Sequence, residues 1–241
     1  MKIEVLFPDV ANLYGDLFNV KYLEQCTNCE VINTNLNDTP AFASEKIDII
    51  CMSPMPEFAQ ELAVEKLLPY REKLRELIED GTVFFVTGNA LEIFGQYIEN
   101  EDGSRVDCLK IFDTYAKRDM LNRYNALFLG NFGDMKIAGF KAQFSHSYGG
   151  ENSDRLFERV KGAGLNPDDE GEGIRVNNFF GTYLIGPLLV MNPDFTKYLL
   201  GLAGVKVDKL KFEDEMRDAY NQRIKEFERP DIELAGEKHT I

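Results

Sequence analysis

Short apolar runs alternate with longer stretches of mixed polarity through the first half of the chain. Four of these runs have the length and composition of strands: Lys2–Phe7, Glu30–Asn35, Lys46–Met52 and Thr82–Val86. The third run is nearly all apolar, which is typical of a central strand covered on both faces. The pattern therefore predicts a sheet whose strands are separated by other elements.

Helical spacing of apolar residues fills the gaps between those strands. It predicts a short helix at Asn19–Cys26 and a long one at Glu57–Asp80, which Pro69 is expected to kink or split. Gly81 is placed to cap the long helix, and Ala90–Tyr97 is predicted as the helix after the fourth strand. Strand–helix alternation predicts an α/β fold, doubly wound, with a mainly parallel sheet and helices on both faces. Ligands are expected at the carboxyl ends of its strands.

The second half of the chain is richer in strands. Four apolar runs predict additional, antiparallel strands: Cys108–Thr114, Tyr124–Leu129, Lys136–Phe144 and Val176–Leu184. Two polar stretches that contain Gly predict surface loops: Glu99–Arg105 and Asn166–Gly173. Two helices are predicted last: Pro193–Leu200 and about Asp208–Phe227. With no internal repeat and no linker, we expect a single domain at residues 1–228 and a polar tail at 229–241.

Composition and charge limit the classes of function. With 44% hydrophobic and 28% charged residues, the chain has the make-up of a soluble globular protein. No apolar run approaches the roughly 18–20 residues that span a bilayer. Acidic Glu4 and Asp9 interrupt the N-terminus where a signal peptide needs an apolar core, so we expect a cytoplasmic protein. The net charge of −14 disfavours nucleic acid and anionic membrane as partners.

Cysteine and histidine are scarce, with four and two residues respectively. Cys26 and Cys29 form a lone C-x-x-C that closes a helical stretch and lacks further zinc ligands, so we interpret them as partly buried thiols. His146 and His239 are the only imidazoles, and His239 is almost at the chain end. Since His is the usual general base and metal ligand, we expect neither a metal site nor a cofactor.

The stretch FFVTGNALEIFG, Phe84–Gly95, joins an apolar strand to a helix through a turn of small residues. This layout commonly places a nucleophile on a tight turn at the top of an α/β sheet. Here the turn reads Thr87-Gly88-Asn89-Ala90, with neither Cys nor Ser. The pattern predicts the shape of a nucleophile elbow without its nucleophile.

Two longer blocks flank this stretch. The first, FPDVANLYGDLFNV, resembles YPDLMNLYGDRGN and matches it at Pro8, Asp9, Asn12, Leu13, Tyr14, Gly15, Asp16 and Asn19. The last, FFGTYLIGPLLVMNPDF, resembles GTYLHGPLLPKNP and matches it at Gly181, Thr182, Tyr183, Leu184, Gly186, Pro187, Leu188, Leu189, Asn192 and Pro193. Between them, the elbow stretch resembles AVCGGYQLLG.

In this order, the three blocks are similar to the class I glutamine amidotransferases of the cobyric acid synthase type. Within that family, the branch of the lipid II isoglutaminyl synthase glutaminase subunit resembles the chain most. The resemblance implies a flavodoxin-like, three-layer fold over most of the chain. It also implies an activity in which a thiolate attacks the side-chain amide of glutamine, a His assists, and backbone N–H groups hold the oxyanion.

The catalytic positions depart from the family pattern. Aligned on Gly95, the family's Cys falls on Gly88 and its next Gln on Glu92, while the family's His falls on Ile185. The oxyanion loop GGGQDREQ falls on SPMPEFAQ, in which Gln60 is kept. The resemblance places these residues around the pocket: Ser53, Pro54, Met55, Gln60, Asn89 and Glu92.

Two residues are candidates to replace the missing dyad, but the interpretation we favour for each is structural. Cys51 ends the third strand and reads as a buried strand cysteine with no base beside it. His146 follows Gly139–Gln143, where the family has GFENH and this chain has Lys141, Ala142 and Gln143 at the Glu, Asn and His positions. We interpret His146 as a solvent-facing His at a strand end. Asp16 and Asn19 either line the active face or cap the following helix, and the sequence leaves both readings open.

Three functions follow from the resemblance and its departures. The favoured one is a catalytically degenerate glutaminase fold that acts as a binding or scaffold subunit, with a Mur-ligase-like synthetase as partner. The first alternative is a working amidotransferase that supplies ammonia for a cell-wall or corrinoid precursor, with Cys51 and His146 as the pair. The second alternative is a sensor whose pocket binds glutamine or a related small amide or amino acid.

Overall fold

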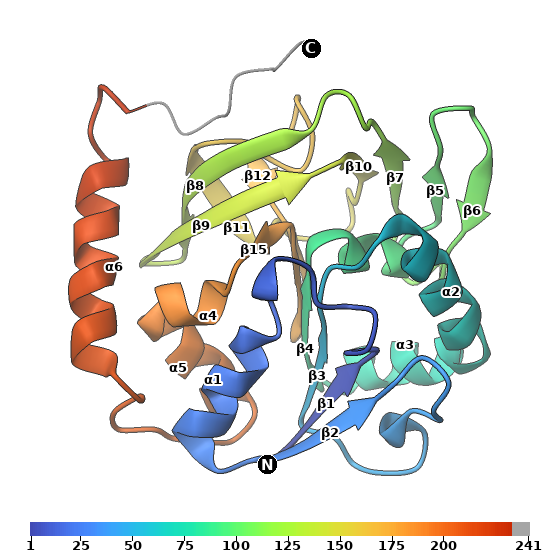
Figure 1. The fold of residues 1–241 in the computed structure, drawn as a ribbon, viewed down its shortest axis with the longest axis horizontal. Coiled ribbons are helices and arrows are strands. Elements are labelled where there is room, and N and C mark those ends of the chain that lie inside the picture. Colours follow the sequence, from blue (N-terminus) through green and yellow to red (C-terminus); the bar gives the residue numbers. More distant parts are fainter. Residues whose placement is uncertain (233–241) are drawn as a thin grey trace.

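The computed structural model describes residues 1–232; residues 233–241, which include His239 and most of the predicted tail, lie outside the described part. A six-stranded sheet forms the lower half of the molecule in Figure 1, in the order β13-β14-β4-β3-β1-β2. Its strands are β1 Lys2–Leu6, β2 Glu30–Thr34, β3 Ile49–Met52, β4 Val83–Thr87, β13 Ile174–Val176 and β14 Phe179–Thr182. Every pairing is parallel except that of β13 with β14. The predicted mainly parallel sheet is confirmed.

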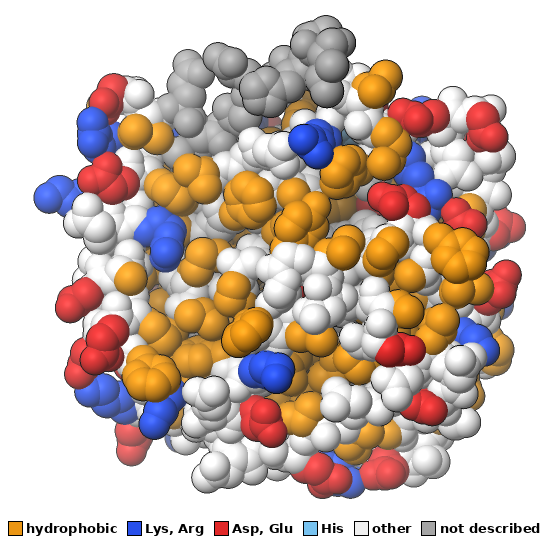
Figure 2. All heavy atoms as spheres, in the orientation of Figure 1, with side chains coloured by type: hydrophobic (Ala, Val, Ile, Leu, Met, Phe, Trp, Pro, Cys, Tyr) orange, Lys and Arg blue, Asp and Glu red, His pale blue; other side chains and the backbone are white. Residues whose placement is uncertain are grey.

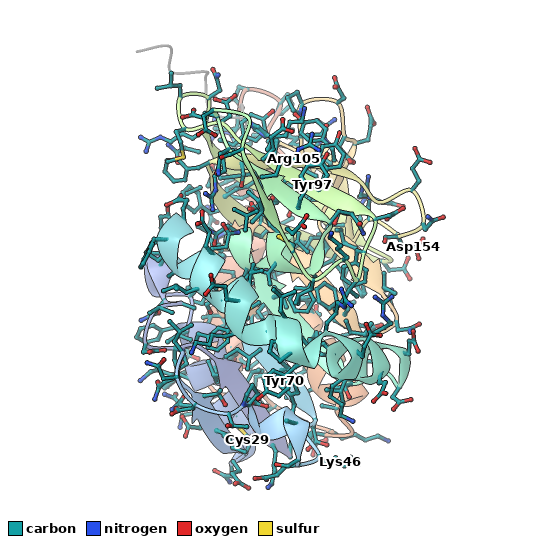
Figure 3. All side chains as sticks on the ribbon, turned by 90° about the vertical axis from the view of Figure 1, so that its right-hand side faces the viewer. Cys29, Lys46, Tyr70, Tyr97, Arg105 and Asp154 are labelled. Atoms are coloured by element: carbon teal, nitrogen blue, oxygen red, sulfur yellow. The ribbon has the colours of Figure 1, made fainter. Side chains whose placement is uncertain are left out.

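Helices cover both faces of this sheet because successive strand residues point to opposite sides. Ile50 and Met52 of β3 pack in one core with α2 and α3, while Ile49 and Cys51 pack in the other with α1 and α5. The helices are α1 Phe18–Thr27, α2 Glu57–Leu67, α3 Arg71–Glu79, α4 Leu188–Met191, α5 Pro193–Leu202 and α6 Glu213–Phe227. Seen from the side, α2 and α3 lie in front, and Tyr97 and Arg105 mark the strands above them (Figure 3).

The predicted long helix is split at Pro69, as expected. The 3₁₀ turn η3, Leu68–Tyr70, separates α2 from α3, since proline has no N–H to continue the helical ladder. Gly81 follows α3 with a φ of +81°, and its N–H donates to Ile78 O at 3.2 Å while the next N–H donates to Leu77 O at 2.9 Å. This is the pairing of a Schellman motif, in which a left-handed residue ends the helix.

Two further sheets, which contain most of the antiparallel strands, lie above the parallel sheet in Figure 1. The four-stranded sheet has the order β10-β7-β5-β6, from β5 Tyr97–Glu99, β6 Arg105–Asp107, β7 Thr114–Arg118 and β10 Ser145–Gly149. The five-stranded sheet has the order β12-β11-β8-β9-β15, from β8 Tyr124–Phe132, β9 Met135–Gln143, β11 Phe157–Lys161, β12 Gly171–Glu172 and β15 Leu184–Ile185. The extra strands predicted at Tyr124–Leu129 and Lys136–Phe144 are confirmed as β8 and β9.

Two predicted elements are wrong near the elbow. Residues Ala90–Tyr97 do not form an α-helix: η4, a 3₁₀ helix at Gly88–Phe94, precedes β5. Residues 108–113 do not form a strand either, although Cys108, Leu109 and Phe112 are buried, and only Thr114 belongs to β7. The two errors have one cause, because N–H groups from residues 109–112 donate to carbonyls of residues 93–95 and so end the helix early. Both segments are apolar because they are buried, although neither forms the α-helix or strand that the apolar pattern predicted.

Three other boundaries differ from the predictions. The run Val176–Leu184 is divided among β13, β14 and β15, and a left-handed turn at Asn177, with a φ of +52°, separates β13 from β14. The last helix begins at Glu213 rather than near Asp208, and the predicted loop Asn166–Gly173 contains β12. Among the described residues, no helix combines the length and apolar character needed to cross a bilayer.

Candidate functional site

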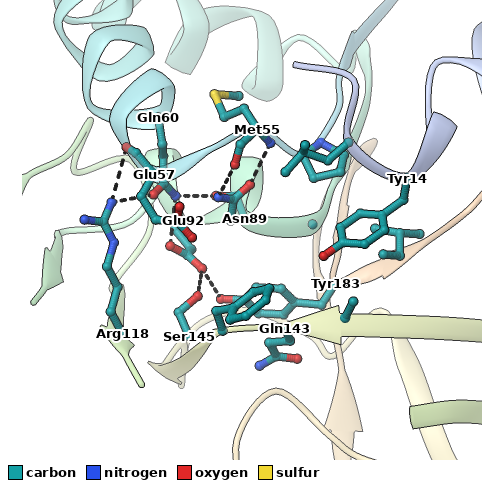
Figure 4. Close-up of a pocket in the computed structure, with 16 residues that line it drawn as sticks. Tyr14, Met55, Glu57, Gln60, Asn89, Glu92, Arg118, Gln143, Ser145 and Tyr183 are labelled. Atoms are coloured by element: carbon teal, nitrogen blue, oxygen red, sulfur yellow. Dashed lines mark hydrogen bonds between the residues drawn. The ribbon is translucent and has the colours of Figure 1, made fainter. Parts of the chain in front are cut away.

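A cavity of about 50 Å³ lies at the carboxyl ends of the parallel strands, between them and the antiparallel sheets (Figure 4). The elbow, the loop before α2 and strands of both upper sheets contribute to its wall. Of the residues predicted for the pocket or the catalytic positions, seven line it: Pro54, Met55, Gln60, Gly88, Asn89, Glu92 and Ile185. From the matching blocks, Tyr14 and Tyr183 also line it.

The elbow has a left-handed residue at its tip. Thr87 ends β4 with extended backbone, and Gly88 then turns with a φ of +59°. A Cβ atom placed on Gly88 would lie 2.5 Å from Cβ and 3.1 Å from Cγ of Pro54. Gly88 is therefore required both by its backbone conformation and by the close approach of Pro54. The space in which a side chain at position 88 would begin is filled by the proline ring.

The loop that includes Pro54 is tied to the elbow by one side chain. The N–H of Met55 donates to Asn89 Oδ1 at 3.0 Å, and Asn89 Nδ2 donates back to Met55 O at 2.8 Å. Pro54 and Pro56, on either side, have no N–H. The centre of the loop thus has one backbone donor, and that donor is already bonded.

Ile185, in β15, also forms part of the cavity wall. It is buried, with 1% of its surface exposed, and its alkyl side chain neither accepts nor donates a proton. No Cys or His lines the cavity in the described part of the chain. Within residues 1–232 there is also no cluster of His, Cys, Asp and Glu that could hold a metal ion.

Neither replacement candidate reaches the cavity. Cys51 is 2% exposed and packs in the core under α1 and α5, and burial raises the pKa of its thiol well above the usual range. His146 lies in β10, with its ring 4.6 Å from that of Tyr124. It is only 5% exposed, so the prediction of a solvent-facing His is wrong. Burial lowers the pKa of His146, and its Nδ1 has no hydrogen-bond partner.

A buried carboxyl, Glu92, organises the cavity floor. Tyr183 Oη donates to Glu92 Oε1 at 2.8 Å, Ser145 Oγ donates to the same oxygen, and Gln60 Nε2 donates to Oε2 at 2.9 Å (Figure 4). Burial raises the pKa of Glu92, and these hydrogen bonds oppose the rise. Arg118 donates to Gln60 Oε1 at 2.9 Å, so the floor extends from α2 to β7. The contacts join four separate segments around one acid.

A second buried carboxyl, Asp16, lies just behind the elbow and does not line the cavity. It accepts from Gly186 N, Ser53 Oγ and Asn19 Nδ2, each at 3.1 Å, and from Thr87 Oγ1. Burial raises the pKa of Asp16, and the hydrogen bonds from those donors act in the opposite direction. We call Asp16, Asn19, Ser53, Thr87 and Gly186 the Asp16 cluster. Asn19 Oδ1 also accepts from Leu189 N at 2.9 Å, so the cluster joins the first matching block to the last.

The Asp16 cluster answers the question that the sequence left open. Neither Asp16 nor Asn19 lines the cavity. Neither caps the following helix, because the N-cap position of α1 is Leu17 and no side-chain hydrogen bond caps the helix there. Both side chains instead cross-link segments up to 170 positions apart. No local pattern signals such contacts. The only hint was that both residues belong to a block that resembles a family.

The other matching residues shape the backbone around these networks. Tyr14 and Gly15 have φ values of +60° and +69° in η1, Leu13–Gly15, and Asn12 Oδ1 accepts from Leu17 N at 3.4 Å. Gly186 turns with a φ of +70° before Pro187, which precedes α4. Gly181 lies in β14 with Thr182, where a Cβ would lie 2.4 Å from Leu91 Cδ1. Thr182 Oγ1 donates to the buried Glu172 at 2.8 Å.

Comparisons with known proteins find relatives over most of the chain. The CobB/CobQ-like glutamine amidotransferase domain matches residues 2–193. The GatD subunit of the glutamine-hydrolysing lipid II isoglutaminyl synthase of Staphylococcus aureus is 30% identical over 197 residues, covering 80% of this chain and 79% of that protein. The Streptococcus pneumoniae GatD subunit is 26% identical over 213 residues, covering 84% and 80%.

Two solved structures share the fold. A glutamine amidotransferase crystal structure has a TM-score of 0.53 at 13% identity and covers 84% of this chain and 99% of its own. A glutamine amidotransferase from Thermotoga maritima has a TM-score of 0.52 at 10% identity, covering 94% and 91%. At these identities the likeness concerns the arrangement of helices and strands.

Proposed function

The chain belongs to the CobB/CobQ-like glutamine amidotransferase family, and from that premise we propose that it is a GatD-like subunit that no longer hydrolyses glutamine. It acts instead as a binding or scaffold subunit for a Mur-ligase-like synthetase in the cytoplasm. The observation that carries this proposal is the contact between Gly88 and Pro54. The ring of Pro54 stands where the side chain of a nucleophile at position 88 would start.

Glutamine hydrolysis by this family's route needs a thiolate, a base and an oxyanion site. The cavity wall supplies none of them: Gly88 has no side chain, Ile185 cannot take a proton, and the N–H of Met55 is bonded to Asn89. Removing a single oxyanion donor costs an enzyme about 10²–10³ in kcat. Three coincident losses support an inactive site better than a rearranged one.

The two alternatives fit the geometry less well. A thiolate at Cys51 would need its pKa lowered, whereas burial raises that pKa, and His146 is on a different sheet. A sensor of free glutamine would need room for the whole ligand. The cavity holds about 50 Å³, which corresponds to three to five water molecules at about 10–15 Å³ each. A cavity of that size suits a few waters or the tip of a side chain.

The subunit role rests on the two relatives, both of which are named as one subunit of a larger synthase. We carry that role over to this chain, with the ligase-like subunit as its partner. The Asp16 cluster supports this subunit role, because its hydrogen bonds hold the first and last matching blocks together without involving the cavity. A scaffold requires that arrangement but not the chemistry.

The test is ammonia release from glutamine by the full chain, alone and with a purified Mur-ligase-like synthetase of the same organism. We expect no release above the buffer rate in either case. The Streptococcus pneumoniae GatD subunit with its synthetase serves as the positive control. Release that is lost on Cys51→Ala would overturn the proposal in favour of the first alternative.

A gain-of-reactivity experiment tests the placement of the two missing groups. We expect the thiol of Gly88→Cys/Pro54→Gly/Ile185→His to react with iodoacetamide at pH 7 at least about 10-fold faster than that of Gly88→Cys/Pro54→Gly. The reason is that an adjacent imidazole stabilises a thiolate. Equal rates would contradict the placement of His at position 185, whatever the outcome of the ammonia assay.

A further inference from the structure

A groove of about 740 Å³ is separate from the cavity and shares no lining residue with it. The β8–β9 hairpin, the chain around the start of β11, Arg175 of β13 and Tyr198 of α5 form its wall. We call it the Arg175 groove. Its volume falls within the range of about 300–1,000 Å³ that is usual for small-molecule sites. Unlike the cavity, it has room for a whole small molecule.

The guanidinium of Arg175 is held among aromatic rings but makes few hydrogen bonds. It lies 5.0 Å from the ring centre of Phe132, 5.5 Å from that of Phe180 and 6.0 Å from that of Tyr198. Nη2 donates to Tyr198 Oη at 2.8 Å, and Tyr198 supplies the only acceptor for this guanidinium among residues 1–232. A guanidinium has five N–H donors in a planar fork that matches a carboxylate. Most of that fork is therefore open to a ligand.

Arg155, also in the groove wall, shows the opposite condition. Its Nε donates to the two carboxylate oxygens of Asp169 at 3.1 and 3.0 Å. Its Nη1 and Nη2 donate to the carbonyls of Gly150 and Gly149 at 3.3 and 3.1 Å. Each nitrogen of Arg155 is thus bonded within the chain. An anion that enters the groove meets its open fork at Arg175.

Asp154 lies directly across the backbone from Arg175. The two residues form an isolated antiparallel bridge, in which Arg175 N donates to Asp154 O at 2.8 Å. Residues that face each other in this way have Cβ atoms about 4.5–5.5 Å apart on the same side of the pair. Even so, the Asp154 carboxylate makes no ion pair within 4.0 Å with Arg175 or any other residue of the described chain. An acid and a base stand side by side without neutralising each other.

Two further acids, Asp134 and Glu158, line the groove. Like Asp154, both are exposed, and neither makes an ion pair or a side-chain hydrogen bond within residues 1–232. On the face shown in Figure 2, by comparison, acidic and basic side chains lie intermixed. Within the described residues, the groove combines three unpaired carboxylates with one guanidinium that has no acidic partner. That balance favours a ligand with one negative group and more than one positive group, and disfavours phosphate esters and dicarboxylates.

Apolar side chains complete the wall beside these charges. They are Phe132, Met135, Leu156 and Tyr198. An alkyl chain packs on such a surface while its charged end reaches a polar partner. The ligand that fits the groove therefore has a short alkyl chain between its charged groups.

The geometry points to a binding site for a basic α-amino acid, such as lysine or ornithine, in the Arg175 groove. The ammonium and carboxylate of an α-amino acid are attached to one carbon, which matches an acid and a base on facing residues. The carboxylate binds the Arg175 fork and the α-ammonium binds Asp154. The alkyl side chain lies along the apolar wall, and its terminal cation binds Asp134 or Glu158. This site goes beyond the proposed function and does not depend on it.

The first experiment measures binding of L-lysine to the full-length chain by titration calorimetry, beside two analogues that each lack one charged group. L-norleucine lacks the terminal ammonium, and cadaverine lacks the carboxylate. We expect L-lysine to bind with a Kd below about 1 mM. Each analogue should bind at least about 10-fold more weakly, because one charged partner in the groove is left without its ligand group. The series uses the wild-type chain, so its result does not depend on the folding of a variant.

Substitutions then locate the site. We expect Arg175→Gln and Asp154→Asn each to weaken L-lysine binding at least about 10-fold. Arg175→Lys keeps the charge without the fork and should recover only part of the affinity. Arg123→Gln and Asp218→Asn make the same changes of charge at exposed positions outside the groove, and should change the affinity less than about 2-fold. Circular dichroism confirms that all five variants are folded.

The other outcomes overturn the inference. L-lysine that does not bind overturns the site. L-norleucine that binds as tightly as L-lysine overturns the role of the second cation, and cadaverine that does so replaces the amino acid by a polyamine. L-lysine binding that is unchanged in Arg175→Gln and Asp154→Asn lies outside the groove. The ammonia assay is independent of all these results, so failure here and failure of the proposed function are distinguishable.

Discussion

The Asp16 cluster and the cavity wall are adjacent regions built from the same three chain segments. Ser53, Thr87 and Gly186 donate to Asp16, and the residues next to them, Pro54, Gly88 and Ile185, line the cavity. On each segment, one residue holds the backbone in place and its neighbour faces the cavity. Asp16, Asn19 and Gly186 match the family blocks, whereas Pro54, Gly88 and Ile185 depart from them. The difference shows that a resemblance in short blocks can report how segments are held together and still say nothing about activity.

The largest expected effect comes from breaking the Asp16 cluster. Asp16→Ala removes the acceptor of four donors, leaves Ser53 Oγ and Gly186 N without a hydrogen-bond partner, and should lower the free energy of unfolding by about 3–5 kcal/mol. Urea denaturation of the full chain measures this. Asp16→Asn, which keeps one acceptor, should lose roughly half as much. Asp218→Ala on the surface of α6 is the control, expected within about 0.5 kcal/mol. An Asp16→Ala chain as stable as the control would show that the cluster does not hold the segments.

The next largest effect is expected at Gly88, in the cavity wall. Gly88→Ala forces a Cβ against Pro54 and should cost about 2–3 kcal/mol of unfolding free energy. The matched control is Gly103→Ala, where φ is also positive, at +83°, but nothing lies within 4 Å of the new Cβ. Only the backbone strain of about 1 kcal/mol is expected there.

A double-mutant cycle separates the clash from the strain. With Pro54→Gly in the background, Gly88→Ala should cost only about as much as Gly103→Ala, which gives a coupling of about 1–2 kcal/mol. Additive effects would mean that Pro54 does not fill the space beside Gly88. The cycle is read by urea denaturation of the four chains.

The smallest effect concerns the cavity floor and depends on pH. Because burial raises the pKa of Glu92, the folded chain holds a proton there more tightly than the unfolded chain does. The resulting penalty is absent below the ordinary Glu pKa, grows as pH rises from that value to the raised one, and is complete above it. Glu92→Gln removes this pH-dependent penalty, because the amide does not ionise. The variant also makes a less favourable contact with Gln60 Nε2, which donates to Glu92 Oε2 in the wild type. We therefore expect the variant to become more stable relative to the wild type as pH rises above the ordinary Glu pKa of 4.5.

Parallel urea titrations at several pH values measure that difference. Glu158→Gln, in an exposed part of β11, is the control and should show no such trend. A wild-type chain that gains on Glu92→Gln as pH rises would mean that the ionised form is stabilised by its three donors, which would reverse the inferred balance.

Much of the parallel sheet was predictable because each strand is a short apolar run between helices. The split at Pro69 and the cap at Gly81 were predictable too, since they depend on the residue alone. The elbow's 3₁₀ helix was not, because residues 109–112 end it from outside. The close approach of Pro54 to Gly88 and the bond from Gly186 to Asp16 join segments 34 and 170 positions apart, respectively. Local periodicity contains no information on such contacts.

The contact between Pro54 and Gly88 also determines the order in which the two positions can change. A side chain introduced at position 88 first meets the proline ring at 2.5 Å, so that intermediate is strained. A change at position 54 first opens the space, and a later change at 88 then meets only its own backbone preference. The effects of changes at the two sites therefore depend on each other. Changing position 54 before position 88 avoids the strained intermediate, whereas the opposite order passes through it. Laboratory evolution of a new nucleophile in this protein should therefore vary position 88 in a chain that already has a smaller residue at position 54. A library that varies position 88 alone would retain Pro54 and its clash in every variant.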